Sequence, residues 1–316
     1  MNTRKLGNSS PQVTPLCFGG NVFGWTIDEK NSFELLDALA DSGLNFIDTA
    51  DVYSRWKPGN HGGESETIIG KWMKKSGKRD RLVIATKVGM DMGGGRKGLS
   101  KAHILESVDN SLQRLQTDYI DLYQSHADDP ATPQEETLNT YAELIKSGKV
   151  RAIGASNFSA ERLRQALEIS EKHGLPRYES LQPEYNLYNR AGFENELESL
   201  CQENGIGVIS YYSLASGFLS GKYRSAQDLS KSPRGNIKVK SYLNERGSRI
   251  LDALDRVAEE KNSTPARVAI AWVMARPSIT APIASATTID QLKDLIAATK
   301  LTLDAPSMEV LNRASA

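Results

Sequence analysis

Short apolar segments alternate with amphipathic stretches along almost the whole chain, and this alternation constrains the fold more than any other feature. Several of the apolar segments are continuously apolar, which is typical of parallel strands covered on both faces. Between them, apolar residues recur at helical spacing, as at Ile104, Val108, Leu112 and Leu115. The candidate strands are Leu16–Gly19, Asn45–Asp48, Leu82–Lys87, Tyr119–Gln124, Val150–Gly154, Ser180–Gln182, Ile206–Ser210 and Thr280–Ile283.

Eight strand–helix units in succession favour a closed (β/α)8 TIM barrel over an open doubly wound sheet. A chain of 316 residues commonly fills one such barrel, so we expect a single domain over residues 1–316. The segment from Arg4 to Pro15 contains a Gly7-Asn8-Ser9-Ser10 turn and predicts an N-terminal β-hairpin ahead of the first barrel strand. Longer irregular stretches follow strands two, three and seven, on the face where barrel enzymes place their sites: Ser54–Gly63, Gly89–Gly98 and Ser216–Asn236.

The charge balance argues against several classes of partner. Lysine plus arginine and aspartate plus glutamate number 39 each, so nothing favours binding to nucleic acid or to an anionic membrane. The N-terminus has no apolar run long enough for a signal peptide. Cys17 and Cys201 lie among apolar neighbours and are expected to be buried thiols in a reducing cytoplasm. No cluster of Cys and His has metal-ligand spacing, so we expect no metal site.

Four ionisable residues follow successive candidate strands. Asp48, Lys87 and His126 stand at or just after the ends of strands two, three and four, and Tyr53 lies in the loop after Asp48. Neighbouring strand ends share one rim of a barrel, so these side chains can converge on one pocket. A buried lysine needs a partner, for which Asp48 is the evident candidate, and we expect the lysine to lower the pKa of Tyr53 toward working pH. Such a group can donate a proton to a carbonyl oxygen.

Each of these residues also has an ordinary structural interpretation. Taken alone, Asp48 is equally consistent with a helix N-cap. For the other three residues taken alone the ordinary interpretation is the better one: Tyr53 as a loop aromatic, Lys87 as a solvated strand end and His126 as a hydrogen-bonded polar residue. Their joint occurrence at successive rim positions favours the catalytic interpretation.

Several further segments, in order along the chain, resemble the motifs of the aldo-keto reductase superfamily. Phe46 to Tyr53 followed by Gly63-Glu64-Ser65-Glu66-Thr67-Ile68-Ile69-Gly70 is similar to that family's Asp–Tyr signature and its G-x-S-E-x-x-[LI]-G motif. The other matching segments are Ala85-Thr86-Lys87, Tyr123-Gln124-Ser125-His126, Gly154-Ala155-Ser156-Asn157-Phe158, Gln182-Pro183-Glu184-Tyr185-Asn186, Tyr211-Tyr212-Ser213-Leu214, Gly221-Lys222-Tyr223 and Thr264-Pro265-Ala266.

The resemblance implies a barrel with extra C-terminal helices, and it implies roles for individual residues. Tyr53 would be the general acid, tuned by Lys87 and Asp48, and His126 would orient the carbonyl. Ser156, Asn157 and Gln182 would bind the nicotinamide carboxamide, and Tyr211 would stack on the nicotinamide ring. The remaining cofactor-binding candidates are Gly20, Asn21, Asp48, Ser213, Leu214, Ser216, Lys222, Arg234, Ser285, Thr287 and Gln291.

The C-terminal cofactor segment departs from the family pattern. Many members have a lysine or glycine, then serine and arginine, around the adenosine 2′-phosphate, whereas this chain has Ser285 and Gln291 at the outer positions. Thr287 and Gln291 resemble a branch that includes potassium channel beta subunits, which bind NADP. Arg234 and Lys222 could supply the missing charge. We therefore expect NADP(H) as the cofactor, with NAD(H) as the alternative.

The candidate substrate contacts are Trp25, Tyr53, Trp56 and His126. Flat indoles suit sugars, steroids and aromatic aldehydes alike, while Arg55, Lys57, Asn60 and His61 would favour a hydroxylated or anionic substrate. Simple anchoring of the loop is an equally good interpretation of these residues.

The sequence thus predicts a cytoplasmic oxidoreductase, monomeric or homo-oligomeric, that reduces small aldehydes, ketones or sugars with a Tyr general acid. The alternative is a redox-sensing regulatory subunit like the channel beta subunits, which keep the same four residues. The chain begins directly at the hairpin, with no preceding tail to act on a partner, and this favours the enzyme. A barrel of other chemistry, such as a metal-dependent aldolase, finds no phosphate motif or metal ligands here.

Overall fold

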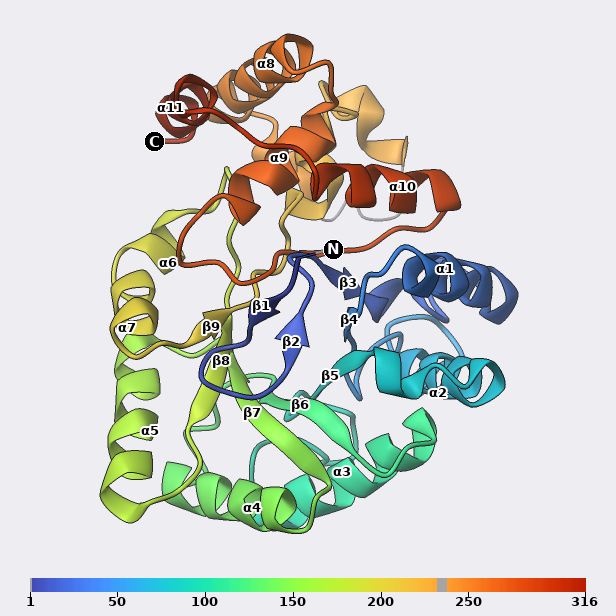
Figure 1. Cartoon of the computed structure of the whole chain (residues 1–316), viewed down its shortest axis with the longest axis vertical. Helices are drawn as coiled ribbons and strands as arrows, with labels where there is room; N and C mark the ends of the chain where they lie inside the picture. Colours follow the sequence, from blue (N-terminus) through green and yellow to red (C-terminus); the bar gives the residue numbers. More distant parts are fainter. Residues whose placement is uncertain (1, 232–237) are drawn as a thin grey trace.

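The computed structural model describes residues 2–231 and 238–316. Eight parallel strands at its centre are hydrogen-bonded in the order β10-β3-β4-β5-β6-β7-β8-β9 (Figure 1). The two end strands are joined because the N–H groups of Thr280 and Ile283 donate to the carbonyl oxygens of Val208 (2.9 Å) and Ser210 (2.7 Å). The strands are β3 (Cys17–Gly19), β4 (Phe46–Asp48), β5 (Val83–Val88), β6 (Ile120–Ser125), β7 (Val150–Ser156), β8 (Tyr178–Gln182), β9 (Gly207–Val208) and β10 (Ile283–Ala284). The predicted (β/α)8 barrel is confirmed.

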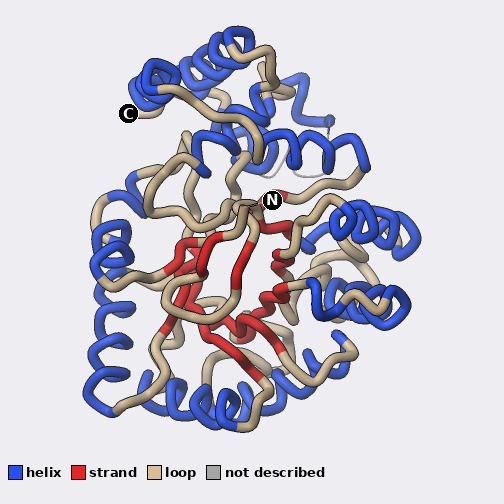
Figure 2. Tube along the Cα trace, in the orientation of Figure 1, coloured by secondary structure: helices blue, strands red, loops and turns tan. Residues whose placement is uncertain are grey.

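Helices surround these strands, as Figure 2 shows. The helices around the barrel are α1 (Glu29–Asp41), α2 (Glu64–Ser76), α3 (Lys101–Leu115), α4 (Gln134–Lys146), α5 (Ala160–His173), α6 (Ala191–Glu194), α7 (Leu197–Glu203), α9 (Pro265–Met274) and α10 (Ile289–Ala298). Two more, α8 (Glu245–Glu260) and α11 (Ala305–Ala314), pack against each other at one end of the molecule (Figure 1). They are the expected extra C-terminal helices. In the described part of the chain, no helix is long and apolar enough to cross a membrane.

The N-terminal hairpin and the helix starts agree with the sequence. Strands β1 (Arg4–Lys5) and β2 (Gln12–Val13) pair antiparallel. Helix α5 begins where Ser159 accepts a hydrogen bond from the N–H of Arg162, and α9 begins where Thr264 caps the helix and proline takes an early position. Polar caps therefore set these boundaries.

The last strand begins later than predicted. We expected Thr280–Ile283, but β10 starts at Ile283. The N–H groups of Thr280 and Ala281 both donate to Val208, so these residues join the chain to β9 rather than to β3. Pro282 has no N–H and cannot extend a ladder. The parallel ladder with β3 is therefore confined to the two residues after the proline.

Alternation along the strands divides the barrel interior into two layers. Phe46, Ala85 and Leu122 belong to a buried apolar cluster, which the hairpin residues Leu6 and Val13 join. Successive side chains of a strand point to opposite faces, so the residues two positions further on face the same interior. Those residues are Asp48, Lys87 and Gln124, and all three are buried. The barrel thus places a polar layer above an apolar one, toward the carboxyl ends of the strands.

Candidate active site

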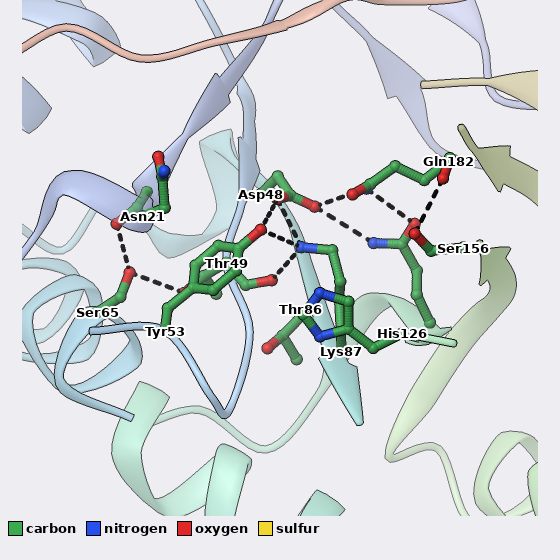
Figure 3. A network of polar contacts seen from close by, with 12 residues as sticks. Asn21, Asp48, Thr49, Tyr53, Ser65, Thr86, Lys87, His126, Ser156 and Gln182 are labelled. Carbon is green, nitrogen blue, oxygen red and sulfur yellow. Dashed lines mark hydrogen bonds and ion pairs between the residues drawn. The ribbon is translucent and has the colours of Figure 1, made fainter. Parts of the chain in front are cut away.

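Asp48, Tyr53 and Lys87 form one hydrogen-bonded unit at the carboxyl ends of β4 and β5 (Figure 3). The Nζ of Lys87 lies 2.6 Å from Oδ2 of Asp48 and 2.8 Å from the hydroxyl of Tyr53. The same carboxylate oxygen accepts the hydroxyl of Tyr53 at 3.1 Å. The side chains of Lys87 and Asp48 are 0 % and 2 % exposed, so this ion pair lies away from solvent.

Every polar group of the ion pair has a partner. The ammonium donates to Asp48, to Tyr53 and to the carbonyl oxygen of Thr49, at 2.8 Å for the last, which uses all three of its protons. The second carboxylate oxygen of Asp48 accepts the side-chain amides of Gln182 (2.9 Å) and Gln124 (3.3 Å). A buried ion pair is tolerated only with such complete hydrogen bonding. The pair therefore depends on residues from four different strands.

Gln124 is a polar neighbour of the carboxylate to which the sequence analysis gave no role. It stands two residues before His126 and two after the interior Leu122, so strand alternation alone could have placed it inside the barrel. The side-chain NH2 group of Gln124 donates to the Asp48 carboxylate, and its side-chain oxygen accepts a hydrogen bond from the NH2 group of Gln182 at 3.2 Å. Gln124 thus holds both the carboxylate and Gln182 in place.

The pKa of Tyr53 is raised well above its usual value, first by burial and then by the neighbouring Asp48 carboxylate. This is the opposite of the direction that we predicted from the lysine alone. The lysine and the carboxylate both contact the phenol, so their charges oppose each other there and burial prevails. The hydroxyl is therefore protonated in this structure, as a proton donor must be.

His126 lies beside this unit, on the chain directly after β6. Its ring meets that of Tyr53 edge-on, with centroids 6.0 Å apart. Burial, and then the charge of Lys87, lower the pKa of His126 well below its usual value, so the imidazole is neutral. Within the described residues, its buried Nδ1 has no hydrogen-bond partner. The four predicted catalytic residues are therefore brought together.

The residues predicted to contact the nicotinamide form a continuous polar chain beside the ion pair. Ser156 donates to the carbonyl oxygen of Gln182 at 2.9 Å. The amide of Asn157 donates to the carbonyl oxygen of His126 (2.9 Å) and to the Ser156 hydroxyl (3.2 Å), and its oxygen accepts the Tyr211 hydroxyl at 2.8 Å. Asn157 has a positive φ of 57°. This chain of bonds joins the ends of β6, β7 and β8 to the half-buried ring of Tyr211.

The turn after β9 carries unusual backbone strain. Tyr212, Ala215 and Ser216 have φ values of 55°, 47° and 58°, a region that non-glycine residues rarely adopt. Several such residues close together are typical of ligand-binding segments. The exposed Lys222 lies over this turn, since a Cβ on Gly217 would be 3.3 Å from its Nζ. The predicted contacts Ser213, Leu214 and Ser216 are in or beside the turn.

The remaining cofactor candidates fall into two groups. Asn21, next to Gly20 after β3, accepts a hydrogen bond from the hydroxyl of Ser285 at 2.7 Å. This bond joins the segment after β3 to the segment after β10 at one rim of the barrel. The amide oxygen of Gln291 accepts from the N–H (2.8 Å) and the hydroxyl (3.1 Å) of Thr287. This leaves the NH2 group of Gln291 as its donor at the start of α10. Arg234 lies outside the described residues.

The two tryptophans predicted near the substrate meet each other and Tyr53. The rings of Trp25 and Trp56 are 5.4 Å apart at 85°, and those of Trp56 and Tyr53 are 5.9 Å apart at 61°. Trp56 therefore lies beside the phenol, and Trp25 packs against Trp56.

A second set of buried charged residues, to which the sequence motifs give no role, lies next to Thr86, the residue that precedes Lys87 in β5. The fully buried Glu66 accepts the hydroxyl of Thr86 (2.5 Å) and the Nε of Arg114 (2.6 Å). Asp51 is 3 % exposed, and one of its carboxyl oxygens has no hydrogen-bond partner among the described residues. Burial, and then the charge of Glu66, raise the pKa of Asp51 to about 7.

Comparison with known proteins agrees with this barrel and its polar centre. The model of the aldo/keto reductase family matches residues 15–316. The chain is 36 % identical over 315 residues to the uncharacterized oxidoreductase YrpG of Bacillus subtilis, covering 97 % of this chain and 94 % of that protein. It is 35 % identical to the aldo-keto reductase YhdN of the same organism, covering 93 % and 86 %. It is 33 % identical to a probable voltage-gated potassium channel subunit beta of Arabidopsis thaliana, covering 93 % and 90 %.

A parallel barrel with a buried lysine–carboxylate pair and a tyrosine at the carboxyl ends of its strands defines a class of oxidoreductases. The chain belongs to the aldo/keto reductase family, and it is an enzyme of that family.

The raised pKa of Asp51 predicts a pH-dependent cost in stability. The unfolded chain loses this proton near the ordinary pKa of 3.8, whereas the folded protein retains it up to about 7, so stability falls as pH rises between the two values. Asp51→Asn replaces the ionisable carboxyl group with a neutral amide of nearly the same size and shape. Its free energy of unfolding relative to wild type should rise by roughly 2–3 kcal/mol between pH 5 and pH 8. Urea unfolding at both pH values measures this, and a constant difference between the two proteins would contradict it.

Proposed function

We propose that the protein reduces aldehydes, ketones or sugars to alcohols with NADP(H), and that Tyr53 donates the proton. The observation that carries the proposal is the position of the Tyr53 hydroxyl, 2.8 Å from the Lys87 ammonium. When the phenol gives its proton to a carbonyl oxygen, the phenolate that remains is next to a cation that is already in place. General acid catalysis of this kind needs a protonated donor, and burial keeps Tyr53 protonated.

The neutral His126 supports the same role assignment. An uncharged imidazole can donate a hydrogen bond to a carbonyl oxygen without adding a second buried cation beside Lys87. We assign it the orientation of the substrate carbonyl.

A nicotinamide cofactor, when bound, would supply the hydride. The proposed contacts are Ser156, Asn157 and Gln182 for its carboxamide and Tyr211 for its ring. The strained turn at 212–217 with Lys222 suits a pyrophosphate, because turns of this kind expose backbone N–H groups. Gly20, Asn21, Ser285, Thr287 and Gln291 would hold the adenosine part. These residues, from the ends of β7 to β10, would together hold a dinucleotide.

NADP(H) is the proposed cofactor, with NAD(H) as the alternative. The NH2 group of Gln291 offers a donor to a 2′-phosphate at the start of α10, where the N–H and the hydroxyl of Thr287 hold its amide oxygen. The first turn of that helix has no basic residue and contains the exposed Asp290. We therefore propose a modest preference for NADPH over NADH.

A regulatory subunit that senses redox state is the second candidate, and the similarity to a probable potassium channel subunit beta is what favours it. Co-purification with a membrane protein would support it, whereas turnover of free carbonyl compounds supports the enzyme. We further propose that residues 1–316 form one domain. The unpaired, buried Cys17 and Cys201 suit a reducing compartment, so we propose that the protein acts in the cytoplasm.

Tyr53→Phe tests the proposed proton donor. The substitution removes only the hydroxyl, so cofactor affinity should stay near that of wild type while turnover falls by roughly two to four orders of magnitude. Steady-state reduction of a small aldehyde and a separate cofactor titration measure the two quantities. Retention of more than about a third of wild-type turnover, with chemistry rate-limiting, would exclude Tyr53 as the proton donor.

Asp290→Asn tests the proposed 2′-phosphate position. Removing a negative charge beside Gln291 should increase affinity for NADPH relative to NADH by roughly twofold to fivefold, because the phosphate is a dianion. Fluorescence titrations with both cofactors measure the ratio, which high salt should reduce. Asp252→Asn, at an exposed site on α8, is the matched control. An equal change for both cofactors would place the phosphate elsewhere.

A further inference from the structure

The loop after β4 exposes one large aromatic side chain beside the proton donor. Trp56 is 47 % exposed, and among the residues that the structure describes it is the only large hydrophobic side chain in that state. A single exposed hydrophobic residue is ordinary on a protein surface. The position of Trp56 points to a role in substrate binding, because the centroid of its ring lies 5.9 Å from that of Tyr53.

Four aromatic rings from three loops follow one another at this place. Trp25 contacts Trp56, Trp56 contacts Tyr53, and Tyr53 contacts His126, with centroids 5.4, 5.9 and 6.0 Å apart. The two rings that contact Trp56 within the described residues meet it at 85° and 61°. Neither ring is parallel to the indole of Trp56, so neither is stacked on the face of that indole.

The polar groups of the same loop mostly fasten the loop itself. The hydroxyl of Ser54 donates to Phe23 at 2.7 Å, and the amide of Asn60 donates to the carbonyl oxygens of Gly24 (3.1 Å) and Ser54 (2.9 Å). The guanidinium of Arg55 donates to the carbonyl oxygen of Asp91 at 3.2 Å. These contacts fix the loop and hold the indole beside Tyr53.

The rings of Trp25, Trp56, Tyr53 and His126 form one aromatic wall. We propose that this aromatic wall selects flat, apolar carbonyl compounds, in which an aryl ring stacks on Trp56 while the carbonyl reaches Tyr53 and His126. This inference rests on the proposed carbonyl reduction and decides between the substrate classes that it leaves open. An aryl ring gains from stacking and from burial against the indole. A sugar has to strip water from several hydroxyl groups, and the wall offers little in return.

The test compares kcat/KM for naphthaldehyde, propanal and erythrose in wild type, Trp56→Ala and Trp56→Phe. Trp56→Ala should lower the ratio of kcat/KM for naphthaldehyde to that for propanal by roughly threefold to tenfold, mostly through KM. Trp56→Phe should retain most of the ratio, because it keeps a ring. Lys172→Ala, which changes an exposed side chain in the last turn of α5, should leave the ratio at the wild-type value.

The outcomes separate this inference from the proposed function. A ratio that stays within about twofold of wild type in Trp56→Ala, or a wild-type preference for erythrose that Lys57→Ala abolishes, would overturn the aromatic selectivity while leaving carbonyl reduction intact. Wild-type protein that reduces none of the three compounds would overturn the proposed function itself. A fall in the ratio with Trp56→Ala and its recovery with Trp56→Phe would support the proposal.

Discussion

The buried ion pair between Lys87 and Asp48 is the interaction on which the rest of the site depends. Removing two charges from water costs several kcal/mol each in real proteins, and only complete hydrogen bonding offsets this. Here the ammonium uses all three protons and the carboxylate accepts four donors. Loss of either partner would leave an uncompensated buried charge, a loss that costs about 3–5 kcal/mol. The pair therefore constrains both the fold and the chemistry.

The barrel makes this pair possible by supplying its partners from separate strands. Asp48, Lys87, Gln124 and Gln182 come from β4, β5, β6 and β8, and each faces the interior or the rim that these strands share. The apolar layer below, extended by the hairpin, excludes water from the other side. Tyr53 then lies where a cation, a carboxylate and the ring of Trp56 meet, and burial in this environment keeps its hydroxyl protonated.

Much of this could be predicted from local sequence. Continuous apolar strands and the polar residues that end them indicate the barrel and bring Asp48, Tyr53, Lys87 and His126 to one rim, because strand ends share a face. The errors come from contacts between distant residues. The direction of the Tyr53 pKa depends on two opposed charges at similar distances, and the start of β10 depends on which neighbour Thr280 bonds. No local pattern carries that information.

The same limit applies to side chains that bond within the protein. Asn60 is polar in the sequence and suggests a substrate contact, yet its side chain donates to two carbonyl oxygens and fastens its own loop. Gln124 shows the converse, since strand alternation places it inside the barrel but only the structure shows that it holds the carboxylate.

The most direct test of the central claim is the pH dependence of alcohol oxidation in wild type and Lys87→Met. The Lys87 ammonium should stabilise the phenolate that Tyr53 becomes, so loss of the ammonium should move the ionisation of Tyr53 to higher pH and also lower the rate. Circular dichroism and cofactor binding establish that the variant is folded. If the rate falls while the ionisation stays at its wild-type pH, Lys87 acts on something other than the tyrosine, and the central claim is wrong.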